Sequence, residues 1–107
     1  MTKKVLFICG WNIDRSPTAE DLLKDKEGYE VKSAGTRPGA RNKVSKELTE
    51  WADIIFVMEQ EHEVALKQIN PEATKKIIVL NIRDNYKRGD PRLTKILTDK
   101  LSKYIQI

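Results

Sequence analysis

The only cysteine of the chain ends an apolar run and precedes residues that suit anion binding. Cys9 closes the run 5–9, Arg15 follows after five intervening residues, and Ser16 and Pro17 come next. A strand would bring the thiol to the edge of a sheet, where a short loop and a helix start offer N–H groups and partial positive charge. An arginine fork can hold two oxygens of one phosphate group. The pattern indicates a thiolate nucleophile beside an oxyanion-binding loop.

The hydrophobic pattern predicts strands that alternate with helices. Continuous apolar runs are typical of strands buried on both faces, and apolar residues at helical spacing are typical of amphipathic helices. Strands are expected at 5–9, 29–33, 53–58 and 77–82, and helices at 16–26, 44–51, 61–69 and 93–104. This order implies parallel βαβ units. The fold class is therefore α/β, a three-layer sandwich with a central four-stranded parallel sheet.

Capping signals mark the expected helix ends. Ser16 suits the N-cap of the first helix with Pro17 at its first position, and Ser45 suits the next N-cap. The pair Asn70-Pro71 stops the third helix. The pair Asp90-Pro91 has the pattern that opens the last one.

Polar residues follow the expected strands at their carboxyl ends. Cys9 ends the first strand, and Ser33, Glu59 and the loop beginning at Asp84 come at the ends of the others. Ligands of open parallel sheets bind at these ends, near the switch in strand order. Four loops are therefore expected to converge on one crevice.

Size and composition favour one soluble domain over residues 1–107. Lys and Arg total 20 against 16 Asp and Glu, a net charge of +4, but the basic residues are scattered and form no stripe that would suit nucleic acid. One cysteine cannot form an internal disulfide. The apolar run after Lys3 and Lys4 is too short for a signal peptide or a membrane span. We expect a cytoplasmic protein with no nucleic-acid or membrane partner.

The run Cys-x5-Arg-Ser-Pro after the first strand, in this α/β order, resembles the low-molecular-weight protein tyrosine phosphatases. The likeness continues through 33–36, through 52–59, and through 81–86, which is similar to the family's general-acid loop. It covers most of the chain and is closest to a shortened branch, because only 37–43 separate the second strand from the next helix. The resemblance implies a phosphotyrosine phosphatase I-like fold.

The resemblance also implies the central roles in catalysis. Cys9 would be the nucleophile, Arg15 would clamp the phosphate and Asp84 would be the general acid. The phosphate-binding loop would comprise Gly10, Trp11, Asn12, Ile13, Asp14, Arg15 and Ser16.

Four residues would support this loop, two within it and two outside it. By resemblance, Asn12 would brace it, Ser16 would stabilise the thiolate, Ser33 would join the supporting network and Glu59 would lie near its base. Asparagine also tolerates the left-handed backbone that such a loop needs. Glu59 would either orient Arg15 or remain an exposed acid after a strand.

Three positions leave alternatives open. Asp14 stands where the family has a second cysteine, and it either bonds a loop amide or weakens anion binding by repulsion. Asp84 is followed by Asn85 rather than proline, so Asp90 is the alternative general acid, unless it only caps the last helix. Trp11 would form an aromatic wall of the site with Tyr86, or pack against a helix instead.

The chemistry expected is hydrolysis of phosphotyrosine or a small aryl phosphate through a cysteinyl-phosphate intermediate, with inorganic phosphate as product. No metal or organic cofactor is expected, and His62, alone between two glutamates, is expected to be solvated. One alternative is a catalytically weak or inactive module that binds phosphate or a phosphoprotein. An arsenate reductase is less favoured, because a chain with one cysteine would need an external thiol.

Overall fold

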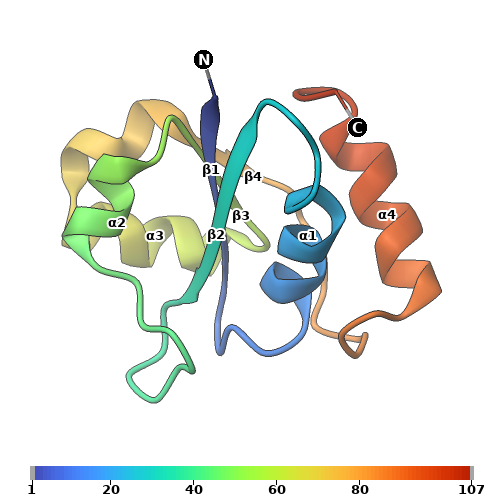
Figure 1. Cartoon of the computed structure of the whole chain (residues 1–107). Helices are drawn as coiled ribbons and strands as arrows, with labels where there is room; N and C mark the ends of the chain where they lie inside the picture. Colours follow the sequence, from blue (N-terminus) through green and yellow to red (C-terminus); the bar gives the residue numbers. More distant parts are fainter. Residues whose placement is uncertain (1, 107) are drawn as a thin grey trace.

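The computed structural model describes residues 2–106, in which a parallel sheet lies between two groups of helices (Figure 1). The strands are β1 (Lys3–Cys9), β2 (Tyr29–Gly35), β3 (Ile54–Val57) and β4 (Ile77–Val79), in the order β2-β1-β3-β4. One face carries α1 (Arg15–Leu23) and α4 (Pro91–Leu101); the other carries α2 (Lys46–Trp51), α3 (Gln60–Ile69) and the 3₁₀ helix η1 (Pro71–Lys76). The predicted three-layer α/β fold with four parallel strands is confirmed.

The central strand β1 separates two apolar cores. Val5, Phe7 and Cys9 belong to the core under α1 and α4, whereas Leu6 and Ile8 belong to the core under α2 and α3. Successive side chains of a strand point to opposite faces, so a strand buried on both sides must be apolar throughout. The sulfur of Cys9 is thereby directed to the α1 side of the sheet.

Parallel pairing brings the carboxyl ends of the strands to one edge of the sheet. Cys9 pairs with Gly35 of β2, and Ile8 of β1 pairs with Val57 of β3. Because the chain leaves β1 for β2 on one side and returns to β3 on the other, the end of β1 lies where the strand order switches. The loops after β1, β2 and β4 all emerge at this edge, at the bottom of Figure 1.

All four strands differ in length from the sequence prediction. β1 begins earlier, at Lys3, and β3 is one residue shorter at each end, Ile54–Val57. β2 continues through Gly35, because its pairing with β1 continues as far as Cys9. β4 ends at Val79 rather than at Ile82, although the amides of Leu80 and Ile82 still donate to carbonyls of the β3 segment at 2.8 Å. The chain thus follows the sheet beyond the regular strand, and this keeps the start of the next loop beside β3.

The loop 36–43 runs along the segment that follows Cys9. Thr36 donates its amide to the carbonyl of Cys9 at 3.0 Å, and Arg37 donates to that of Gly10 at 2.9 Å. Gly35 is the point of closest approach: a Cβ there would lie 2.6 Å from the carbonyl oxygen of Gly10 and 2.7 Å from the Cβ of Ala40. Glycine at this position lets the two segments pack together.

No helix within residues 2–106 is both long enough and apolar enough to cross a membrane.

We predict that Gly35→Ala lowers the free energy of unfolding by about 1–3 kcal/mol, since the added methyl group forces backbone to move. Urea denaturation measures the change. Gly10→Ala is the matched control, because its Cβ would meet only ordinary contacts of 3.6–3.9 Å, and its stability should stay within about 1 kcal/mol of the wild type. Equal stability of both variants would contradict the packing argument.

Candidate active site

The Cys9 thiol is buried at the end of β1 and contacts two hydrogen-bond donors. Its Sγ accepts the amide N–H of Asn12 at 3.2 Å and lies 3.0 Å from the hydroxyl of Ser16. Asn12 has a φ of 58°, so the expected left-handed backbone is confirmed. This conformation turns its N–H back toward the sulfur.

A chain of side chains orients the Ser16 hydroxyl. The side-chain nitrogen Nδ2 of Asn12 donates to Ser16 Oγ and to Ser33 Oγ, both at 2.9 Å. The Ser33 hydroxyl in turn donates to the carboxylate of Glu20 at 2.6 Å. Because the Ser16 oxygen accepts from Asn12, its own hydrogen is available for Cys9. Glu20, which no pattern in the sequence indicates as part of the site, ends this series of hydrogen bonds.

The predicted N-cap role of Ser16 is wrong. Helix α1 begins at Arg15 with Asp14 at the N-cap, which makes no side-chain capping hydrogen bond. The Ser16 hydroxyl instead bonds to Cys9 and Asn12, because the backbone between β1 and α1 brings those groups within reach of it.

The buried guanidinium of Arg15 is held from one side. Its Nη1 pairs with the carboxylate of Glu59 and donates to the carbonyl of Ile82 at 2.8 Å. Among residues 2–106, no protein group hydrogen-bonds to Nη2. Nε lies 3.7 Å from a carboxylate oxygen of Asp84. The Nε–Nη2 edge of the fork is the part that can take two oxygens of an anion.

Six of the predicted site residues surround a small cavity of about 50 Å³. It is lined by Cys9, Trp11, Ile13, Asp14, Arg15 and Asp84. The thiol and guanidinium are buried, whereas the side chains at the rim are open: Trp11 is 45% exposed, Ile13 is 52% exposed and the Asp84 side chain is 57% exposed. The cavity thus combines a charged floor with an apolar and acidic rim.

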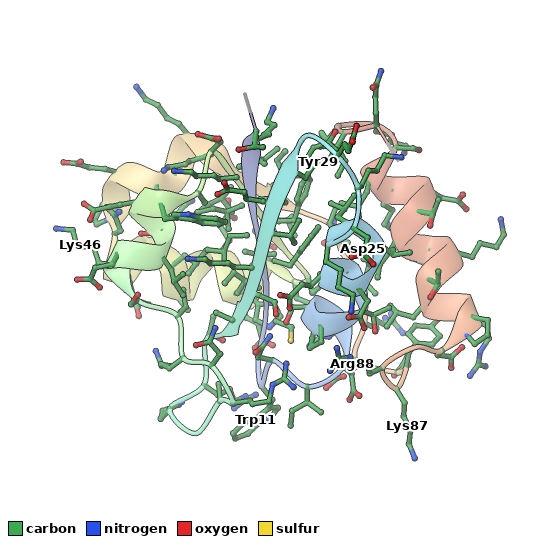
Figure 2. All side chains as sticks on the ribbon, viewed as in Figure 1. Trp11, Asp25, Tyr29, Lys46, Lys87 and Arg88 are labelled. Carbon is green, nitrogen blue, oxygen red and sulfur yellow. The ribbon has the colours of Figure 1, made fainter. Side chains whose placement is uncertain are left out.

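The wall residue Trp11 packs against the loop 36–43 and not against a helix. The Arg37 guanidinium lies 5.5 Å from the centre of its ring, and a Cβ at Gly39 would come within 3.3 Å of it. In Figure 2 the labelled Trp11 lies at the lower end of the molecule, beyond the end of β1. It therefore borders the mouth of the cavity.

Tyr86 and Asp90 do not line the cavity that contains Cys9 and Arg15. Tyr86 lines a different hollow, near α4, where the Arg92 guanidinium stands 5.5 Å from its ring. Asp90 caps α4 by accepting the amide of Arg92 at 2.8 Å, and it pairs with the Arg92 side chain. These bonds to Arg92 hold the pKa of Asp90 below its ordinary value. Of the two aspartates considered as general acid, Asp84 is the one beside Cys9 and Arg15.

Within residues 2–106, no three His, Cys, Asp or Glu side chains are grouped so that they could hold a metal ion.

Solved structures with the same architecture are tyrosine and arginine phosphatases. The tyrosine phosphatase Wzb of Escherichia coli K30, in complex with phosphate, superposes with a TM-score of 0.79 at 25% identity, over 97% of this chain and 96% of that one. Wzb of Vibrio vulnificus, in complex with benzylphosphonate, gives 0.79 at 24% identity, over 97% of each chain. The arginine phosphatase YwlE of Geobacillus stearothermophilus gives 0.72 at 25% identity, over 94% of this chain and 91% of that one.

The chain has the fold of the low-molecular-weight protein tyrosine phosphatases. No protein-family model and no curated protein sequence matches it. In this fold, the segment between β1 and α1 lies beside the cavity, with Cys9 at the end of the strand and Arg15 at the start of the helix.

His62 is an unexpected part of this phosphatase-fold site, and the expectation of a solvated side chain is wrong. The residue is 1% exposed, and its Nδ1 accepts the amide of Glu59 at 3.0 Å. A histidine at the third position of α3 thereby fixes the residue that pairs with Arg15. Burial, and then the nearby Arg15 charge, lower the pKa of His62 below its ordinary 6.5.

We predict that this buried histidine makes stability depend on pH. The pKa of His62 in the folded state is lowered from 6.5. As the pH falls, His62 therefore takes up a proton in the unfolded chain before it does so in the folded chain. The free energy of unfolding should therefore fall as pH decreases below about 6.5, by at most about 1.4 kcal/mol per pH unit from this residue. His62→Gln keeps an acceptor for the Glu59 amide and should flatten the profile between about pH 7 and 5.5. Denaturant titrations of both chains measure this; parallel profiles would refute the prediction.

Proposed function

We propose that the chain hydrolyses phosphomonoesters of the phosphotyrosine or aryl phosphate type through a cysteinyl-phosphate intermediate. The observation that carries this proposal is the buried thiol, which accepts an amide hydrogen bond in the same small cavity as the guanidinium fork of Arg15. The structural likeness to tyrosine phosphatases supports it.

In the first step, Cys9 Sγ forms a bond to phosphorus while the bond from phosphorus to the leaving oxygen breaks. Arg15 and the loop amides stabilise the charge on the transferred phosphoryl group, which is where most of the catalysis of such a reaction lies. Asp84 gives its proton to the leaving oxygen.

In the second step, water attacks phosphorus and the phosphorus–sulfur bond breaks. Asp84 takes a proton from this water, and inorganic phosphate leaves with the thiolate restored. The water enters where the leaving group has departed, so one carboxylate on the rim serves both steps.

The shape of the cavity favours substrates that present a phosphate on a flat apolar group. A volume of about 50 Å³ suits a phosphate, and the exposed side chains of Trp11 and Ile13 at the rim provide an apolar surface for an aryl ring. The substrate is then a small aryl phosphate or a phosphorylated protein.

A second candidate is a module that binds phosphate without turnover. The carboxylates of Asp14 and Asp84 both line the cavity and oppose a dianion by repulsion. Binding of phosphate with no hydrolysis of any phosphomonoester would favour this candidate.

We predict that the wild-type chain hydrolyses a chromogenic aryl phosphate and that Cys9→Ser lowers kcat on the order of a thousandfold. Release of inorganic phosphate measures both rates. Phosphotyrosine and phosphoarginine peptides are assayed beside it, because tyrosine and arginine phosphatases share the fold. Turnover that survives loss of the thiol would eliminate the mechanism.

We predict that Asp84→Asn lowers kcat for phenyl phosphate about a hundredfold, since the leaving phenolate then departs without a proton. Asp90→Asn is the matched control: it keeps an oxygen that can cap α4, and its activity should stay near the wild type. A greater loss in Asp90→Asn than in Asp84→Asn would reverse the assignment of the general acid.

A further inference from the structure

The loop 84–90, which carries Asp84, is tied by hydrogen bonds to the side chains of Asp14 and of two residues of α1. The Arg88 amide donates to Asp14 Oδ1 at 2.9 Å, and the Gly89 amide donates to Thr18 Oγ1 at 3.1 Å. The Arg88 guanidinium donates to both carboxylate oxygens of Asp21, at 3.0 and 2.9 Å. In Figure 2 the labelled Arg88 lies beside the lower end of α1. A segment without regular secondary structure is thus held at three points.

Asp14 differs from the other two attachment residues, because it also belongs to the phosphate-binding loop. It immediately precedes Arg15 and lines the same cavity as Asp84. Its carbonyl accepts the Thr18 hydroxyl at 2.7 Å, so its backbone is held by the helix while its side chain holds the other loop. One residue therefore connects the site for the phosphate with the loop of the proton donor.

We propose that Asp14 is a positioning residue that holds Asp84 over the phosphate site. This inference rests on the proposed function. The Asp84 side chain is 57% exposed, and the one ion pair that it makes among residues 2–106 is with Arg15 Nε at 3.7 Å. Its position therefore depends on where the loop backbone is held. Asp14 fixes that backbone four residues further on, at Arg88.

The same carboxylate places a negative charge on the rim of an anion site. Its hydrogen-bonding role and its charge oppose each other: the bond to Arg88 aids proton transfer, while the charge weakens phosphate binding. Two substitutions separate them. Asp14→Asn keeps an oxygen acceptor for the Arg88 amide and removes the charge, whereas Asp14→Ala removes both.

The test compares a leaving group that needs a proton with one that does not. In Asp14→Ala, kcat/KM for phenyl phosphate should fall about tenfold relative to kcat/KM for dinitrophenyl phosphate, whose leaving anion is already stable. Asp14→Asn should keep the wild-type ratio, and both variants should bind inorganic phosphate more tightly as a competitive inhibitor. Asp25→Ala removes a charge from an exposed residue at the opposite end of α1 (Figure 2) and should change neither quantity.

A double-mutant cycle shows whether Asp14 acts through Asp84. In the Asp84→Asn background there is no proton donor to position, so Asp14→Ala should no longer change the ratio between the two substrates. The proposal would be overturned if the single variant Asp14→Ala kept the wild-type ratio, or if Asp14→Asn lowered the ratio as much as Asp14→Ala does. It would also be overturned if Asp14→Ala still lowered the ratio in the Asp84→Asn background.

Failure of the proposed function gives a different result. If the wild type hydrolyses no phosphomonoester, the hydrolysis mechanism fails and Asp14 has no proton donor to position, which also overturns the inference. If the wild type is active, hydrogen exchange at the Arg88 amide tests the attachment directly: exchange should quicken in Asp14→Ala and not in Asp14→Asn. Equal exchange in all three chains would show that the bond does not hold the loop.

Discussion

The arrangement of the site depends on a buried positive charge that must be compensated. The guanidinium of Arg15 lies at the carboxyl edge of the sheet, and leaving it unpaired there would cost several kcal/mol. Glu59, from the end of β3, and the Ile82 carbonyl, from the segment after β4, both bind its Nη1. Compensation therefore ties the segments after β3 and β4 to the side chain of Arg15, and it turns the opposite edge of the fork toward the cavity beside Cys9.

Conformational strain at the loop is balanced by hydrogen bonds. Asn12 adopts a positive φ, which costs a non-glycine residue of order 1 kcal/mol. Its amide bonds to Cys9 and its side chain bonds to Ser16 and Ser33, so the unfavourable backbone is fixed from both sides. The packing of Gly35 against Gly10 supports the loop from outside. A loop held in this way presents its donors in fixed positions before any ligand arrives.

Sequence patterns were sufficient for the strands, the layers and the candidate loop, but not for all its supports. The apolar run 5–9 predicts β1 because a strand buried on both faces has no polar alternation. The failure at Ser16 has a clear reason: serine suits a helix cap and a thiol contact equally well, and only the folded loop selects between them. His62 was misjudged because the charge of its sequence neighbours says nothing about the side of α3 that faces the sheet.

The sequence by itself determined the chemistry that can occur: one thiol, an arginine at a fixed spacing, and strands whose ends must meet at one edge. Only the tertiary structure decided which distant groups complete the site. The Ile82 carbonyl and the Arg88 amide are backbone groups, which every residue possesses, so no residue type signals their roles. Likewise, the sequence left both Asp84 and Asp90 as candidates for the general acid. They differ because one lies beside a buried guanidinium and the other caps a helix.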